Sequence, residues 1–171
     1  MASALGDLEV LMLSLKEFTR VRYRNAATRS GLSAVAACLA LCVVPWAQTE
    51  TLHAGRGPGS SESVEPTANV TIAQGGILAI GLFVVVVVFS IVSLRSERVS
   101  VPRERVSAIA AILAALIVAF DAFGPALPPG VEDLFEWRRV PSLYVPFAAS
   151  IVACVFAVNA FLLARRLRSI A

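Results

Sequence analysis

The sequence predicts an all-α integral membrane protein with four transmembrane helices. Hydrophobic residues make up 57% of its 171 residues and charged residues only 16%, and the mean hydropathy is +0.77. Soluble domains carry about 25% charged residues, because a small domain has a large surface to cover with polar groups. Lipid is therefore expected to cover much of this chain. Four long apolar runs and an uneven distribution of basic residues complete the prediction.

The second apolar run shows how the spans are recognised. It contains five consecutive valines, Val84 to Val88, which are typical of a buried strand, but the uncharged stretch extends over residues 77–94. As a helix, this stretch is about 27 Å long at roughly 1.5 Å per residue, close to the bilayer core of about 30 Å. Lipid forces the backbone to pair internally, so the weak helix propensity of valine matters little.

Three further runs pass the same test of length and charge. The four predicted spans are residues 31–47, 77–94, 106–123 and 143–163. Gly124 and Pro125 follow the third span as a helix stop, and Pro146 lies in the first turn of the fourth, where a missing N–H costs little. The chain is thus divided into residues 1–30 and a four-helix transmembrane domain, residues 31–171.

Basic residues predict the orientation of the spans. Twelve of the fifteen Lys and Arg residues lie in residues 1–30, in the 95–105 connection and after residue 163, whereas the other two connections hold three. Because short cytoplasmic segments are enriched in Lys and Arg, both termini are expected in the cytoplasm, with an up-down-up-down path. The expected location is the cytoplasmic (inner) membrane of a bacterium.

Residues 5–23 predict an amphipathic helix before the first span. Its apolar positions recur every three or four residues and alternate with charges; they are Leu5, Leu8, Leu11 or Met12, Leu15, Phe18 and Tyr23. The segment is too short and too charged to span. Two interpretations stay open: the helix lies flat in the cytoplasmic interface, or it packs on the bundle or on a partner.

The two connections on the outer side predict little regular structure. Residues 48–75 are rich in Gly, Pro, Ser and Thr and have no apolar period, so we expect a flexible segment. Residues 131–137 are compatible with one amphipathic turn on the membrane surface.

An internal similarity suggests duplication. Residues 32–44 and 106–118 agree at seven of thirteen positions with an offset of 74, and the segments after the second and fourth spans are similar at an offset of 73. Two spans rich in Ala, Leu and Val also match by composition alone, so both explanations stay open. A true duplication would relate two hairpins by an axis along the membrane normal.

Two polar residues within the spans are candidates for a site. Asp121 is the only acid in an apolar span, and it is expected either to be interfacial, within reach of Arg138 or Arg139, or to mark an ion or substrate path. Asn159 lies about one turn from the inner end of the fourth span. Its expected role is a hydrogen bond between helices. Small residues on the first and third spans are expected at helix contacts: Ala34, Ala37, Ala110, Ala111, Ala114 and Ala115.

Other reactive residue types do not form a recognisable site. The three cysteines, Cys38, Cys42 and Cys154, lie inside apolar runs and are expected to pack as small hydrophobic residues. His53 has no partner that would complete a site. Asn69 begins an Asn-Val-Thr sequon, which is meaningful only in a eukaryote. No catalytic residue, metal site or cofactor is predicted.

Function is therefore predicted from the architecture. We expect a non-enzymatic accessory or scaffold subunit that binds the bilayer and either another membrane protein or a second copy of itself. A small oligomeric transporter or channel is the alternative, and a membrane-embedded lipid-modifying enzyme is the third possibility. The net charge of +3 gives no reason to expect nucleic-acid binding.

Two segments carry a family resemblance. They are the Arg-rich connection with the following span, RSERVSVPRERVSAIAAILAAL, and the Pro-led fourth span, VPFAASIVACVFAVNAFLLARRLRSI. Over residues 93–171 the chain resembles a family of small bacterial four-span membrane proteins of unknown function, of the Bacteroidetes type. It departs from them at the front, where about thirty residues precede the first span. The resemblance implies a fold and a location, and no activity.

Overall fold

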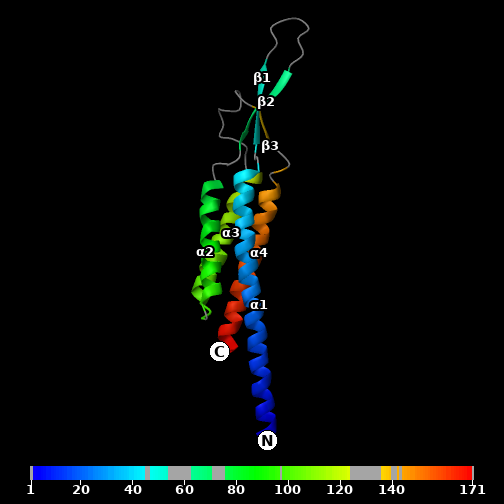
Figure 1. Ribbon diagram of the computed structural model, residues 1–171. Helices are drawn as coiled ribbons and strands as arrows, with labels where there is room; N and C mark the ends of the chain where they lie inside the picture. Colours follow the sequence, from blue (N-terminus) through cyan, green and yellow to red (C-terminus); the bar gives the residue numbers. More distant parts are fainter. Residues whose placement is uncertain are drawn as a thin grey trace.

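The computed structural model forms a bundle of four helices (Figure 1). The helices are α1 (Ala2–Val43), α2 (Gly76–Arg95), α3 (Val101–Phe123) and α4 (Tyr144–Ile170). The structure describes residues 2–44, 47–53, 63–70, 76–96, 98–123, 136–139, 142 and 144–170. All four helices are long and apolar enough to cross a membrane. Helix α1 contacts α2 and α4, and α3 contacts the same two helices, so the four form a closed ring. The predicted all-α class with four apolar spans is confirmed.

The helices extend further than the apolar runs that predicted them. Helix α3 begins at Val101 rather than at residue 106, and α4 continues to Ile170 rather than ending at residue 163. Hydropathy marks where the lipid ends, whereas backbone hydrogen bonding continues through the neighbouring arginines, which are good helix formers. Polar residues at these ends therefore lie on helix faces and not in loops.

Helix α1 differs most from the prediction. It is one helix of 42 residues, about 63 Å long at roughly 1.5 Å per residue, and no break separates residues 5–23 from the first span. Residues 7–30 contain neither Gly nor Pro, so nothing in the sequence stops the helix. Its N-terminal part extends beyond the bundle, past the end of α4 (Figure 1). Val10, Leu11 and Leu13 are all exposed there, and at 3.6 residues per turn they point in three different directions, so the structure does not support the predicted separate amphipathic helix.

Small residues make up most of the bundle core. All six alanines that were expected at helix contacts are buried, which confirms that prediction. They allow the helices to approach closely. Only a few larger side chains are fully buried between them, chiefly Phe83, Leu41, Val86 and Val118.

The buried positions of α2 all recur in α4 at an offset of 74, and four buried positions of α1 recur in α3 at the same offset. In α2 they are Gly76, Ala79, Phe83, Val86, Ser90 and Ser93; in α4 they include Ser150, Ala153, Ala157, Ala160, Ala164 and Leu167. Each α2 position plus 74 gives the α4 position. The same offset relates Ser30, Ala34, Ala37 and Leu41 of α1 to Glu104, Ala108, Ala111 and Ala115 of α3. The helices of the two hairpins thus present equivalent positions to the core, which favours duplication. The offset of 73 between the segments after the second and fourth spans does not match the offset of the buried positions.

A small antiparallel sheet joins the two connections at the end of the bundle opposite the termini (Figure 1). Its strands are β1 (Ala47–His53), β2 (Ser63–Val70) and β3 (Glu136–Arg139), in the order β2-β1-β3. Ala47 pairs with Val70 on one side and with Arg139 on the other. The prediction of an irregular segment over residues 48–75 was therefore wrong for both strands. Of the predicted turn 131–137, the last two residues belong to β3 and the rest lie outside the described residues.

Candidate functional site

Glu104 is a buried carboxylate at the arginine-rich end of the bundle. It lies in the first turn of α3, where the helix dipole favours a negative charge, and only 3% of its surface is exposed. Its position follows from helical spacing, because Glu104 precedes the buried residues Ala108 and Ala111 by four and seven residues. Buried acids in membrane proteins usually have a partner and often mark a site.

Two hydroxyl groups from two other helices bind this carboxylate. The Tyr23 hydroxyl of α1 donates to Glu104 Oε1 at 2.7 Å, and the Ser93 hydroxyl of α2 donates to the same oxygen. Tyr23 is itself buried and packs against Ala164 and Leu167 of α4. All four helices therefore meet around one polar cluster, which we call the Glu104 cluster: Tyr23, Ser93 and Glu104.

More hydroxyl groups lie on the core side of this cluster. Ser30, Ser90 and Ser107 are buried on three different helices. Helices α1 and α2 approach closely there, since a Cβ on Gly31 would lie 3.0 Å from Cβ of Ser90. Within the described part of the chain, the hydroxyl of Ser30 and Nη1 of Arg103 are buried without a hydrogen-bond partner. This end of the core is thus polar and closely packed.

The polar residues do not continue through the bundle. Beyond the serines the core is an apolar cluster that includes Leu41, Phe83 and Val118, all with no exposed surface. Such a cluster separates Glu104 from the far end of α3 at Phe123, which is about 28 Å away along the helix at roughly 1.5 Å per residue. Among the described residues, no polar path crosses the interior of a single chain.

The structure does not bring the two predicted polar residues together. Asp121 is half-buried near the C-terminal end of α3, two residues before Phe123. Asn159 is exposed on the outer face of α4, so within one chain it does not form the expected bond between helices. A transport path through Asp121 and Asn159 therefore has no support from the interior of the bundle.

The cysteines are placed as packing residues and not as a site. Cys38 and Cys154 are half-buried against the apolar cluster, whereas Cys42 is exposed, and all three are free thiols. The Cys38 thiol lies 3.9 Å from the backbone oxygen of Ile80. Among the described residues, no three His, Cys, Asp or Glu side chains are grouped to hold a metal. His53 and Asn69 lie in β1 and β2.

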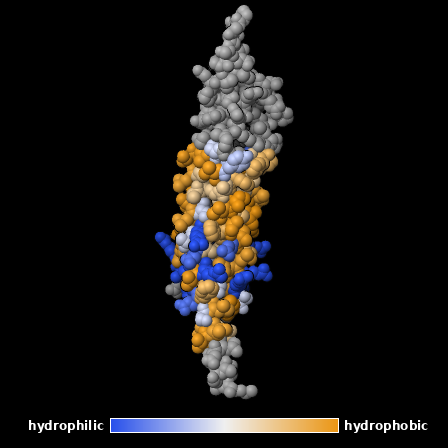
Figure 2. Space-filling view, turned by 90° about the vertical axis from the view of Figure 1, so that its right-hand side faces the viewer, coloured by the Kyte–Doolittle hydropathy of each residue, from blue (hydrophilic) through white to orange (hydrophobic). Residues whose placement is uncertain are grey.

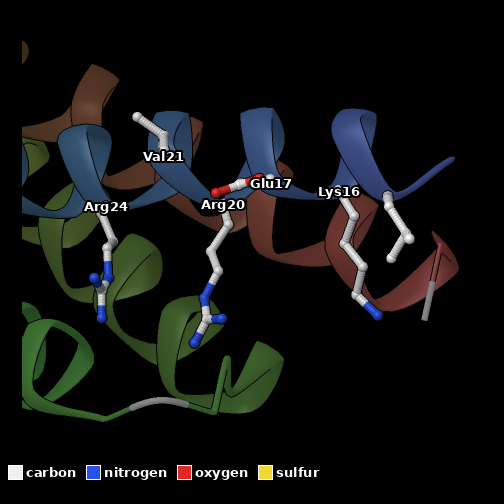
Figure 3. A pocket seen from close by; sticks show the side chains of 6 residues that line it. Lys16, Glu17, Arg20, Val21 and Arg24 are labelled. Carbon is white, nitrogen blue, oxygen red and sulfur yellow. The ribbon is translucent and has the colours of Figure 1, made fainter. Parts of the chain in front are cut away.

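A basic groove runs along the part of α1 that leaves the bundle. It has a volume of about 740 Å³ and is lined by Leu13, Lys16, Glu17, Arg20, Val21 and Arg24. Figure 3 shows Lys16, Arg20 and Arg24 extending toward the same side of α1. They recur every four residues, which places them in one row. The groove therefore holds three cations and the carboxylate of Glu17, and its charge is positive on balance.

Sequence reasoning missed both features for the same reason. It placed Glu104 in the 95–105 connection, and it placed Lys16 and Arg20 on the predicted helix 5–23, but in neither case did it ask which helix face the residue occupies. The repeat could have found Glu104, since an offset of 74 pairs it with Ser30 on the inner face of α1. The four-residue spacing of Lys16, Arg20 and Arg24 was likewise visible in the sequence.

No protein-family model matches the chain, and no curated protein matches it. Function has to be inferred from the molecule's own surfaces and core.

Proposed function

We propose that the protein is a non-enzymatic multi-pass membrane protein, an accessory or scaffold subunit that binds partners through its helices. The observation that carries this proposal is the part of α1 beyond the bundle, where Leu11, Met12, Leu15 and Phe18 are all at least half exposed. Large apolar side chains exposed together on a surface outside the lipid typically mark an interaction site. The closed apolar core gives a substrate no path through the chain.

The orientation belongs to the same proposal. Both chain ends lie at one end of the bundle (Figure 1), and Figure 2 shows a hydrophilic belt there, between the apolar bundle surface and a second apolar patch. Arginines such as Arg95, Arg105 and Arg165 belong to this end. Since basic residues favour the cytoplasmic side, both termini are assigned to the cytoplasm of a bacterial cell. The resemblance to bacterial four-span proteins is part of the proposal and implies the same location.

The N-terminal part of α1 is then a cytoplasmic helix that binds a partner. To lie flat in the interface, α1 would have to kink sharply, and sharp kinks need a cause such as Pro or Gly. None occurs in residues 7–30. Of the two interpretations that the sequence left open, this supports the helix packed on a partner.

The Glu104 cluster has a structural role in this proposal. Its hydrogen bonds link α1, α2 and α3 where α1 leaves the bundle. A buried polar network whose members are satisfied specifies one arrangement of the helices around it. The cluster thus fixes the direction in which α1 projects.

Native mass spectrometry of the protein purified in mild detergent tests the proposal. We expect a larger protein to accompany the chain at a defined stoichiometry. The absence of any partner at any stoichiometry would contradict the scaffold role. A homo-oligomer alone would instead favour the transporter, and Asp121 would then be the first residue to substitute.

A further inference from the structure

Asn159 presents a polar amide to the lipid on the outer face of α4. It lies inside the fourth predicted span, four residues before Leu163, and its side chain is exposed. In the part of the chain that the structure describes, this amide makes no hydrogen bond. The other exposed side chains described within the four predicted spans carry neither an amide nor a charge. Asn159 therefore stands out on an otherwise apolar surface.

The Asn159 side chain is too short to reach the head groups. The end of the predicted span at Leu163 lies about 6 Å further along the helix, at roughly 1.5 Å per residue. The Cα–Cβ bond of a helical residue also tilts toward the helix N-terminus, and α4 begins at the sheet end of the bundle (Figure 1). The amide is thus directed deeper into the span, where lipid offers no hydrogen-bond partner. Leaving an amide unpaired there is costly.

Arg29 of α1 contacts α4 near this level but binds a different residue. Its guanidinium lies over the ring of Phe156, 5.8 Å from the ring centroid. Phe156 is about 60° around the helix from Asn159, at roughly 100° per residue. The partner of the amide therefore has to come from outside the single chain.

Asn159 belongs to a row of exposed residues with heptad spacing, which we call the α4 row. Its members are separated alternately by four and three positions: Ala148, Val152, Val155, Asn159 and Leu162. All five are exposed, and Val155 is the most exposed of the three large apolar members at 59%. They lie within about 40° of one line along the helix, on the side away from buried Ala157. A row with this period is typical of the contact between two helices that cross at a small angle.

A second copy of the chain provides the partner that Asn159 lacks. Two copies in one bilayer are parallel, and a two-fold axis along the membrane normal places each residue of the α4 row opposite its counterpart at the same depth. An amide has both donors and an acceptor, so two Asn159 side chains satisfy each other. In parallel two-stranded coiled coils, a single asparagine at the first heptad position fixes the register and the number of helices. Asn159 occupies that position, seven residues after Val152.

Other contacts between copies would leave the amide unpaired. If the α4 row packed on α2 or α3 of a second copy, it would meet apolar side chains such as Val88 and Leu116, which are exposed there. The internal repeat gives the same answer, because the offset of 74 makes Val85 of α2 the equivalent of Asn159. A head-to-tail contact would therefore bury an unsatisfied amide in every copy.

We infer that two copies of the chain form a parallel, two-fold symmetric dimer through the α4 row, in which the two Asn159 amides hydrogen-bond to each other. The dimer goes beyond the proposed scaffold function, because it uses the outer face of α4 whereas the proposed partner surface lies on α1. The next position of the row, Arg166, lies after the predicted span. Its long side chain extends to the head groups and water, so the apolar contact ends where the lipid ends.

Disulfide cross-linking in phosphatidylcholine vesicles at low protein density tests the dimer. The starting protein is the full-length chain with its three cysteines replaced by alanine. Val152→Cys and Val155→Cys are each expected to give a cross-linked dimer on oxidation, because residues beside a two-fold axis face their own counterparts. The control is Val88→Cys, at an exposed position of α2, which is expected to stay monomeric. Equal cross-linking at all three positions, or none at any, would overturn the inference.

Asn159→Val tests the amide itself. The change removes a polar group from a surface that faces lipid, so each chain is expected to fold as before. Energy transfer between donor- and acceptor-labelled copies in the same vesicles measures the dissociation constant of the dimer. We expect it to rise about tenfold or more, since hydrogen bonds between membrane helices are lost. The matched control is Leu116→Val, at a position of α3 that is 60% exposed, and an Asn159→Val dimer as tight as this control would contradict the inference.

Two further results separate the dimer from other contacts. If Val155→Cys in cell membranes cross-links to a different protein and not to a second copy, the α4 row binds that protein and the inference fails. Deletion of residues 2–18 is expected to leave the dimer intact while it removes the proposed scaffold partner. In native mass spectrometry, a dimer without a larger partner upholds the inference and contradicts the scaffold function, whereas a partner without a dimer does the reverse.

Discussion

At the scale of single residues, the Glu104 carboxylate holds three helices together through few atoms. One oxygen accepts from Tyr23 and from Ser93, so α1, α2 and α3 are joined at a single point. Burying a charge is costly unless hydrogen bonds compensate for it. The stability of this end of the bundle should therefore depend strongly on the hydroxyl groups.

Tyr23→Phe tests this dependence. The change keeps the ring that packs on Ala164 and Leu167 but removes one donor from a buried carboxylate. We expect a loss of about 1–3 kcal/mol in the free energy of unfolding, the usual cost of an unsatisfied buried group, measured by thermal or denaturant unfolding in detergent. Tyr144→Phe is the control because Tyr144 is exposed. Equal stability of the two variants would show that the hydrogen bond contributes little.

Two glycines make opposite predictions. A Cβ on Gly31 would lie 3.0 Å from Cβ of Ser90, which a side-chain rotation cannot move, whereas a Cβ on Gly81 meets nothing within 4 Å. Gly31→Ala is expected to lower the free energy of unfolding by about 1–3 kcal/mol through overpacking. The higher helix propensity of alanine offsets part of this loss. Gly81→Ala shows that gain alone, about 1 kcal/mol of stabilisation. Unfolding of both variants in the same detergent checks the pair, and stabilisation by both would contradict a close α1–α2 contact.

At the scale of whole elements, α4 has an inner face of small residues and an outer face that includes Asn159. Asn159→Leu is expected to change the stability of the single chain by no more than about 0.5 kcal/mol, as for other exposed positions. Ala157→Leu, two residues away and buried, is expected to cost about 1–3 kcal/mol or more. Thermal unfolding of both variants checks this. A large loss for Asn159→Leu would reveal a contact that one chain does not make.

Helix α1 combines a packed part with a projecting part. Because the buried residues described on α1 begin at Thr19, deletion of residues 2–18 should leave the unfolding free energy of the bundle within about 0.5 kcal/mol of the wild type. The same deletion should remove the partner in native mass spectrometry. A bundle that loses stability with the deletion would show that the projecting part packs on its own chain.

The elements were predictable where lipid alone decides their position, and less so elsewhere. Apolar length located α2 almost to the residue, because the bilayer sets that length. Apolar length could not show that α1 is continuous. Charged residues end a membrane-spanning stretch, but they do not end a helix. Apolar length could not place Glu104 either, because only the packing of four helices makes an arginine-flanked acid an interior residue. The strands were missed because β1 is mostly polar, with sequence AQTETLH, and its pairing with β3 joins residues far apart in the chain.

At the scale of the whole molecule, the bundle is two hairpins with matching inner faces. The offset of 74 relates α1 to α3 and α2 to α4. Helices α1 and α3 each contact both α2 and α4. The halves differ in polarity at the arginine-rich end, where Ser90 and Ser93 correspond to Ala164 and Leu167. The Glu104 cluster joins the two halves there, since Tyr23 and Ser93 belong to the first hairpin and Glu104 to the second.

Equivalent substitutions in the two halves test the common plan. Ala37 and Ala111 are related by the offset, and neither has exposed surface. Ala37→Leu and Ala111→Leu are therefore expected to destabilise by similar amounts, about 1–3 kcal/mol each. Exposed Leu39→Ala, on the outer face of α1, serves as the control in the same unfolding measurements. Losses that differ by more than about 2 kcal/mol would argue against equivalent packing.

The central position of β1 has a consequence for biosynthesis. β1 and β2 lie between α1 and α2, so their pairing can form once the first hairpin is inserted, whereas β3 is made only after α3. Until then, one edge of β1 keeps unpaired backbone groups, which other strands can bind. A chain whose synthesis stops before β3 therefore exposes an unpaired edge of β1, whereas β3 covers that edge in the complete chain.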